Sequence, residues 1–111
     1  MNLRNHVQLI GNLGSDPRIY VSKNNVKVAK FSVATTEFFG NKGKETTQWF
    51  TVVAWNKVAE VVEKRCSKGT EVVILGKLRN NNYTDKRGLK RYDMEIHVED
   101  IICRPRVNKA S

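Results

Sequence analysis

The sequence has few of the residues from which metal sites and disulfide frameworks are built. Its two cysteines, Cys66 and Cys103, lie far apart, and its two histidines are His6 and His97. A structural zinc site needs four such ligands, usually in closely spaced pairs. We therefore expect no metal site and no cofactor, and we interpret both cysteines as reduced, partly buried thiols of a cytoplasmic protein.

Long apolar segments are absent as well. No run of about 18 apolar residues could cross a bilayer, and no basic helix has the broad apolar face of a membrane-surface helix. The first residues, Met1 to His6, lack the apolar core of a secretion signal. The sequence thus predicts no membrane contact and a cytoplasmic location.

Acidic residues are scarce relative to basic ones. The 111 residues include 20 Lys and Arg but 11 Asp and Glu, which gives a formal net charge of +9. With 40% hydrophobic residues, a chain of this length is expected to fold as one domain. The excess of positive charge indicates a polyanionic partner, and nucleic acid is favoured over an anionic membrane because no membrane-binding element is present.

No constellation of catalytic residues stands out. The segment Gly11 to Gly14 is not followed by the Gly-Lys-Ser/Thr of a phosphate-binding loop. Asp93, Glu95 and Glu99 alternate along one predicted strand without a nucleophile and base beside them, so we interpret them as a solvated strand face. We expect no catalytic residues and no enzymatic activity.

Apolar residues recur mostly with a period of two, the repeat of β-strands. Strands are predicted at residues 6–13, 26–36, 48–55, 70–79 and 91–100, with a short extended piece at 18–22. The one helical repeat follows Asn56, which is expected to cap the helix, and Gly69 is expected to end it. An all-β chain with one helix between the third and fourth strands is typical of the OB-fold, a five-stranded Greek-key barrel.

Three irregular features interrupt this pattern. The apolar repeat changes phase near Ala29, which predicts a β-bulge or the bend of a barrel strand. Residues 38–47 contain Gly40 and Gly43 and are expected to form a mobile, exposed loop. Asn24-Asn25 and residues 85–88 are turn signals, the second of which closes a long polar hairpin.

Two tryptophans lie on one face of the strand at 48–55. Side chains alternate along a strand, so Trp49 and Trp55 share a face, and Phe50, Val52 and Ala54 share the other. If the second set fills the core, the tryptophans point outward, about 20 Å apart at about 3.3 Å per residue. Exposed rings of this kind stack on the bases of single strands. The alternative is one core tryptophan and one at a subunit contact.

More aromatic residues accompany basic residues elsewhere. The pair Phe38-Phe39 enters the glycine- and lysine-containing loop, and Tyr83 lies on the long hairpin. Between Gly76 and Arg91 the chain has six basic side chains against one acidic side chain. Basic residues interleaved with exposed rings indicate a single-strand groove, although residues 86–91 could also be a merely solvated charge run.

Several segments also carry a family resemblance. In order, they are VQLIGNLGSDP from Val7, FSVATTEFF from Phe31, TQWFTVVAWNKVAE from Thr47, KGTEVVILGKLRNNNYTD from Lys68 and GLKRYDMEI from Gly88. Together they resemble the bacterial single-stranded DNA-binding protein (SSB) family over nearly all of residues 5 to 103. The resemblance implies an OB-fold and a homotetramer around which single-stranded DNA wraps without sequence preference.

The resemblance also implies roles for particular side chains. Base stacking would fall to four aromatic residues, and phosphate contacts to four basic ones: Phe39, Trp49, Trp55 and Tyr83 for bases, and Lys57, Lys68, Arg79 and Arg91 for phosphates. Phe50 stands where many relatives have a histidine at a subunit contact, and His6 where they often have a lysine. The resemblance therefore predicts neither the subunit contact at Phe50 nor a phosphate contact at His6.

The C-terminal residues depart furthest from the family pattern. Relatives continue into a flexible linker and an acidic tip that recruits repair and replication proteins, whereas residues 104–111 are basic. We therefore expect a DNA-binding domain at 1–103, a short flexible basic extension at 104–111, and reduced recruitment of those proteins.

The sequence favours sequence-independent binding and protection of single-stranded DNA in replication, recombination or repair. Two other functions remain open. A primosome-like or RNA-binding OB-fold protein would use the same aromatic platform, and a structural subunit could keep the oligomer contact without binding nucleic acid.

Overall fold

A computed structural model describes residues 4–39 and 43–104. This part of the chain forms six strands and one helix: β1 (Val7–Leu13), β2 (Arg18–Val21), β3 (Lys27–Phe39), β4 (Lys44–Trp55), α1 (Asn56–Arg65), β5 (Glu71–Thr84) and β6 (Lys90–Arg104). All predicted strands and the helix are present. Strands β3, β5 and β6 continue beyond their predicted ends, and β4 begins before its predicted start.

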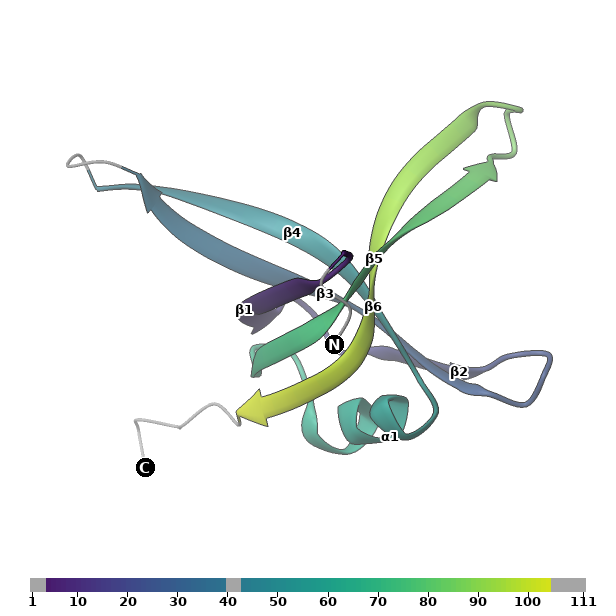
Figure 1. The fold of residues 1–111 in the computed structure, drawn as a ribbon, viewed down its shortest axis with the longest axis horizontal. Coiled ribbons are helices and arrows are strands. Elements are labelled where there is room, and N and C mark those ends of the chain that lie inside the picture. Colours follow the sequence, from purple (N-terminus) through teal and green to yellow (C-terminus); the bar gives the residue numbers. More distant parts are fainter. Residues whose placement is uncertain (1–3, 40–42, 105–111) are drawn as a thin grey trace.

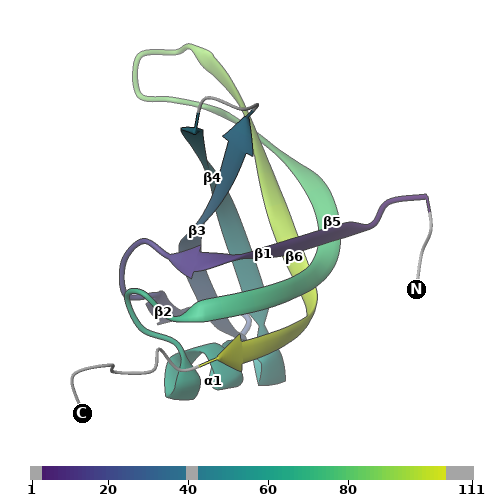
Figure 2. The same cartoon turned by 90° about the vertical axis from the view of Figure 1, so that its left-hand side faces the viewer.

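The strands form one sheet in the order β1-β5-β6-β4-β3-β2, and β1 also pairs with β3. The second pairing closes β1, β3, β4, β5 and β6 into a barrel, while β2 remains outside as a partner of β3 (Figure 1). The pair β4–β6 is parallel and the other pairs are antiparallel. The helix follows the third barrel strand and lies across one end of the barrel (Figure 2). The predicted OB-fold is confirmed.

The core consists of the side chains that point into this barrel. Val33, Val52 and Ile96 come from three neighbouring strands and are almost fully buried, and Ala59 and Val62 of α1 cover the end. Burying an aliphatic side chain of this size stabilises a fold by about 1.5–3 kcal/mol. Because strand side chains alternate, every inward residue has neighbours that point outward.

Barrel closure brings backbones together at two glycines. A Cβ atom on Gly11 of β1 would lie 2.3 Å from the carbonyl oxygen of Ala34 on β3, and one on Gly76 would lie 2.3 Å from that of His97. Only glycine fits such an approach without displacing the partner strand. The register of β5 against β6 also shifts between Leu75 and Gly76, so the strand bends where the backbones meet.

The bulge predicted near Ala29 is therefore wrong in position. Strand β3 pairs in regular register with both neighbours, and the irregularity lies in β5. Val28 and Ala29 are consecutive and both buried, because Ala29 faces the core while Val28 lies between Tyr20 of β2 and Trp55 of β4. The apolar pattern changes phase because neighbouring strands cover the outward side chain of Val28, and not because of a bulge.

The exposed loop predicted at residues 38–47 is also wrong in extent. The β3–β4 ladder continues to the pair Phe39–Lys44, and residues 40–42 lie outside the described part. Threonines at 35, 36, 46 and 47 favour extended backbone, and pairing satisfies backbone groups that a loop would leave to water. The β5–β6 hairpin likewise continues to Thr84–Lys90.

Both predicted ends of the helix need correction. Asn56 is its first residue, has φ of 58°, and no side chain caps the helix. At the other end Cys66 follows Arg65, and its N–H donates to the Val62 carbonyl at 2.9 Å. Gly69 has the expected positive φ, 90°, but its N–H donates to Leu13. It therefore shapes the connection to β5 and does not end the helix. The turn at Asn25, with φ of 63°, is confirmed.

Candidate nucleic-acid interface

The outer face of β4 carries both tryptophans. Val52 and Ala54 have no exposed surface, and Phe50 packs against the same core. Trp49 and Trp55 are therefore on the outward face, as predicted. Trp49 is 61% exposed, whereas Trp55 is half-buried.

The indole of Trp49 rests on the backbone that follows β1. A Cβ atom placed on Gly14 would lie 2.3 Å from the Cζ3 atom of that ring, so a side chain at position 14 would displace it. One side of the ring is thus supported by backbone while much of its surface stays open to solvent. Such a support keeps a large apolar ring in place without burying it.

Trp55 is held by a second ring. His97 of β6 lies beside it with the ring centroids 4.4 Å apart and the planes at 74°. The parallel register pairs Val53 with His97, which brings the histidine beside the end of β4. Edge-to-face contact of this kind fixes the orientation of an aromatic ring.

Tyr83 is the third ring on this side of the barrel. It lies on β5 opposite Arg91 of β6 and is 47% exposed. Lys77, Arg79 and Asn81 precede it at every second position and so share its face. A hollow of about 300 Å³ is lined by Tyr83, Arg91 and their neighbours on the hairpin.

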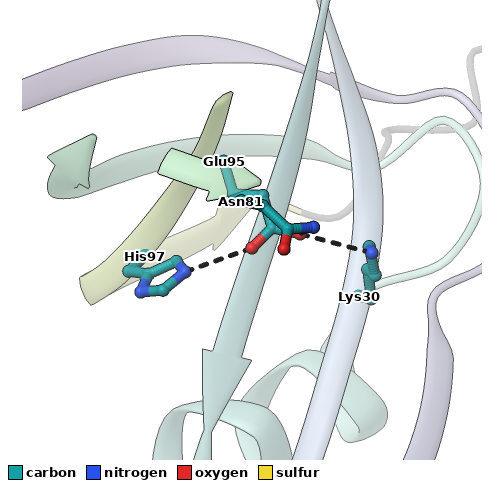
Figure 3. A network of polar contacts seen from close by, with 4 residues as sticks. All are labelled: Lys30, Asn81, Glu95 and His97. Carbon is teal, nitrogen blue, oxygen red and sulfur yellow. Dashed lines mark hydrogen bonds and ion pairs between the residues drawn. The ribbon is translucent and has the colours of Figure 1, made fainter. Parts of the chain in front are cut away.

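Figure 3 shows a polar network at the centre of the same face, to which β3, β5 and β6 contribute. Glu95 of β6 forms an ion pair with Lys30, whose Nζ lies 3.3 Å from Oε2, and accepts a hydrogen bond from Asn81 Nδ2 at 3.2 Å. It also accepts one from His97 Nε2 at 3.3 Å when that nitrogen carries the proton. The side chain of Glu95 is only 13% exposed. The carboxylate therefore fixes Lys30, Asn81 and the histidine that contacts Trp55.

Two hollows adjoin this network and share Lys30 and Thr51. One, of about 270 Å³, is lined by Asn81, Asp93, Met94 and Glu95 in addition. The other, of about 200 Å³, extends past Phe31 and Ser32 to the segment Ser15 to Arg18. Because they share two residues, the hollows follow one another from the β5–β6 side of the face to the end of β1.

The basic residues named from the sequence fall into two groups. Arg79 and Arg91 are exposed on the aromatic face. Lys57 is exposed in the first turn of α1, and Lys68 is exposed in the turn before β5, where its N–H donates to Asp16 at 2.8 Å. The structure thus brings Arg79 and Arg91 together with Tyr83, and leaves both lysines near the ends of α1.

Sequence reasoning missed Lys30 and His97. Lys30 is a single lysine within the apolar run of β3, and that isolated charge was the available signal. His97 alternates with acidic residues on β6 and gave no signal of its own, because its contact with Trp55 depends on the pairing of β4 with β6.

Two of the predicted features cannot be placed fully. Phe39 is the last residue of β3, and its side chain lies outside the described part of the structure. Of the basic extension at 104–111, residues 105–111 also lie outside it, while Arg104 ends β6 and its Nη1 is 3.6 Å from Glu71 Oε1.

The described residues include no helix long and apolar enough to cross a membrane. Among residues 4–39 and 43–104, no group of three or more His, Cys, Asp or Glu side chains is placed to hold a metal ion.

Comparison with known proteins gives consistent results. The model of the single-strand binding protein family matches residues 4–103. The chain is 41% identical over 102 residues to single-stranded DNA-binding protein 1 of Xylella fastidiosa (strain 9a5c), with 87% of this chain and 74% of that protein covered. It is 39% identical over 102 residues to the single-stranded DNA-binding protein of Bacteroides thetaiotaomicron, with 87% and 63% covered.

A solved structure matches the fold. The chain superposes on the Plasmodium falciparum SSB complex with ssDNA with a TM-score of 0.82 and 28% identity. The match covers 94% of this chain and 99% of the other. The resemblance inferred from the sequence segments is therefore confirmed.

The hairpin that carries Arg91 is organised by Asp85. The Leu89 amide first, then the Arg91 guanidinium and the Arg87 amide, hold the pKa of Asp85 below its usual value. The contacts are Leu89 N at 3.0 Å and Arg87 N at 2.9 Å to Oδ1, and Arg91 Nε at 3.1 Å to Oδ2. They are complete above about pH 4, the ordinary pKa of an aspartate, and are lost as pH falls through the lower pKa of the folded state.

We predict that the amide chemical shifts of Arg87 and Leu89 titrate together on acidification, with a midpoint below that of an ordinary aspartate. Asp85→Asn should remove this titration and release Arg91, whereas Asp93→Asn, at an exposed position of the same hairpin, should preserve it. NMR spectra recorded between neutral and strongly acidic pH measure the midpoint. A midpoint at or above the ordinary value would contradict the assignment.

Proposed function

The chain belongs to the single-strand binding protein family, and we propose that it binds single-stranded DNA on the outer face of β3, β4, β5 and β6. The observation that carries the proposal is the presence of Trp49, Trp55 and Tyr83 on one solvent-facing side of the barrel together with Arg79 and Arg91. Every nucleic-acid base has a flat aromatic face, so binding by stacking needs no particular sequence.

Stacking explains why large rings remain in solvent. Exposed tryptophan surface is unfavourable unless a partner covers it, and each stacked base contributes about 1 to 3 kcal/mol. Gly14 supports Trp49 and His97 orients Trp55, so both rings lose little further freedom when a base arrives. Preorganised rings bind more tightly than mobile ones because less ordering is left for the binding step.

Charge on the face separates the base and phosphate positions. Glu95 lies at its centre and already pairs with Lys30, so a phosphate placed there would meet a carboxylate whose lysine is engaged. Arg79 of β5 is exposed opposite Glu95, and Arg91 lies farther out along the hairpin, opposite Tyr83. We therefore place bases over the centre, between Trp55 and Tyr83, and phosphates along the hairpin arginines; Phe39, Lys57 and Lys68 would extend the path at its ends.

The proposed activity is binding without catalysis. A coat of this kind protects exposed single strands during replication, recombination or repair in the cytoplasm. Primosome-like or RNA-binding activity would use the same rings, and competition between poly(dT), poly(U) and duplex DNA distinguishes the three partners.

A homo-oligomer is part of the proposal. Ile10, Val73 and Ile102 lie opposite one another on β1, β5 and β6 and form an outward row away from the aromatic face. Ile10 and Ile102 are 55% and 58% exposed. Phe50, which stands where many relatives have a residue at a subunit contact, is half-buried and packs against its own core. The apolar row supports association with a second copy, and the family resemblance implies a tetramer.

Tryptophan emission should be strongly quenched by oligo(dT), because both tryptophans would stack on bases. Trp49→Ala and Trp55→Ala should each weaken binding by about 1 to 3 kcal/mol while circular dichroism stays unchanged. Tyr92→Ala is the matched control, since Tyr92 is 71% exposed on the opposite face of the β5–β6 hairpin. Equal affinity of the parent and both tryptophan variants would refute the stacking face, and absence of quenching would favour a purely structural subunit.

Affinity should fall as salt is added, with a slope of about 0.7 per phosphate contacted on a single strand. Arg79→Ala and Arg91→Ala should each flatten that slope by about this amount. Lys64→Ala is the control, because Lys64 is exposed in the last turn of α1, away from the aromatic face. Unchanged slopes in both arginine variants would show that the hairpin charge is only solvated.

The protein should be larger than a monomer by light scattering at micromolar concentration. Replacing both Ile10 and Ile102 by Glu should reduce the mass, since charges would face charges across a symmetric apolar contact. Val21→Glu, at a residue that is 59% exposed on β2, should not. A monomeric parent, or a double variant that keeps the parent mass, would contradict association through this row.

A further inference from the structure

Two cysteines that take no part in the proposed interface lie side by side. The Sγ atoms of Cys66 and Cys103 are 2.7 Å apart, although 37 positions separate the residues in the sequence. Carbon atoms in van der Waals contact lie about 3.5 to 4.0 Å apart, and a disulfide bond is about 2.05 Å long. The distance between the two sulfur atoms is thus shorter than a van der Waals contact and longer than a disulfide bond.

Rigid elements hold both cysteines in place. Cys66 follows α1, is buried in the core, and its N–H donates to Val62 of the last helical turn. Cys103 is half-buried near the end of β6 and pairs with Val72 of β5. Cys66 is the first residue after α1 and is held by its burial and its hydrogen bond to the last helical turn, while Cys103 lies within β6. Joining the sulfur atoms would therefore need little backbone movement, which is the usual obstacle to a new disulfide.

We propose that Cys66 and Cys103 are an oxidation site at which a peroxide or a low-molecular-weight disulfide produces an intrachain disulfide that ties β6 to the end of α1. Both cysteines are free in this structure, so the bond would be a state added by oxidation. Each thiol loses one proton and one electron when it forms.

The order of the steps follows from accessibility. The sulfur of the more exposed Cys103 loses its proton and attacks a peroxide oxygen. The O–O bond breaks, Cys103 becomes a sulfenic acid, and the released hydroxide takes up the thiol proton to form a first water. The sulfur of Cys66 then attacks that sulfenic sulfur, the S–S bond forms, and the hydroxyl leaves with the Cys66 proton as a second water. Two thiols are oxidised and one peroxide is reduced. With a low-molecular-weight disulfide, the Cys103 thiolate attacks one of its sulfur atoms and releases one thiol; Cys66 then attacks the Cys103 sulfur of the mixed disulfide and releases the second thiol.

Burial, and then the hydrogen bond to Cys103, raise the pKa of Cys66 to about 12. Cys66 therefore remains a thiol near neutral pH and is not the first sulfur to react, because the thiolate is the reactive form. The second step should accelerate as pH rises, since more Cys66 loses its proton.

The bond would enclose the β5–β6 hairpin. That segment, from Cys66 to Cys103, includes Arg79, Tyr83 and Arg91, yet the link itself joins α1 and β6 away from these residues. We expect a more stable barrel with an unchanged affinity for single strands, since closing a chain segment of this length restricts the unfolded state.

The test uses the full chain treated with hydrogen peroxide or oxidised glutathione. The expected product is an intrachain disulfide, seen as the loss of two hydrogen masses per chain and as a Cys66–Cys103 cross-linked peptide. Its Tm should rise by about 10 °C and return to the starting value with dithiothreitol. Cys103→Ser, which changes the half-buried partner, should show no rise after the same treatment.

Other outcomes overturn the proposal. Free thiols that persist under conditions in which the urea-unfolded chain oxidises would show that the folded geometry does not permit the bond. Disulfides between chains, or a stable glutathione adduct or sulfinic acid on Cys103 alone, would show that Cys66 does not resolve the oxidised sulfur. A disulfide that leaves the Tm unchanged would refute the tie between β6 and α1.

Discussion

The pairing of β1 with both β5 and β3 is the constraint on which the rest of the structure depends. It closes the barrel, and closure gives each barrel strand one side that faces the core and one that faces solvent. The approach of β1 to β3 is close enough that Gly11 has no room for a Cβ atom, and the approach of β5 to β6 leaves none at Gly76. With the inner side filled by aliphatic residues such as Val52 and Ile96, the outer residues of β4 and β5 are free to serve binding.

The outer surface divides into two regions of different chemistry. Over β3, β4, β5 and β6, rings alternate with charges, and Glu95 links Lys30, Asn81 and His97 into one support. Over β1, β5 and β6, the row of Ile10, Val73 and Ile102 is apolar. One region suits a flexible polyanion with stacking bases and the other suits a second copy of the chain, so the same barrel can bind DNA and associate without the two contacts competing.

The sequence was sufficient for the fold and the aromatic positions because alternation is a local property. Period two around Val52 identified the inward side of β4 and thereby the outward position of both tryptophans. It was insufficient for the network at Glu95, since Lys30, Asn81 and His97 meet only through registers among β3, β4, β5 and β6. No local pattern encodes those registers.

Local rules also gave wrong answers where tertiary contacts decide. Asn56 is a good capping residue, but it is already inside the helix at positive φ. The phase change at Val28 and Ala29 reflects cover by Tyr20 and Trp55, which a strand considered alone cannot show.

The central claim is that single-stranded DNA lies across the aromatic face. Its most direct test is photocross-linking with oligonucleotides that carry 5-iododeoxyuridine at single positions, followed by peptide mapping. The account predicts cross-links at Trp49, Trp55 and Tyr83, with none on the row of Ile10, Val73 and Ile102. Cross-links confined to the peptides of that row, or spread evenly over the barrel, would contradict it.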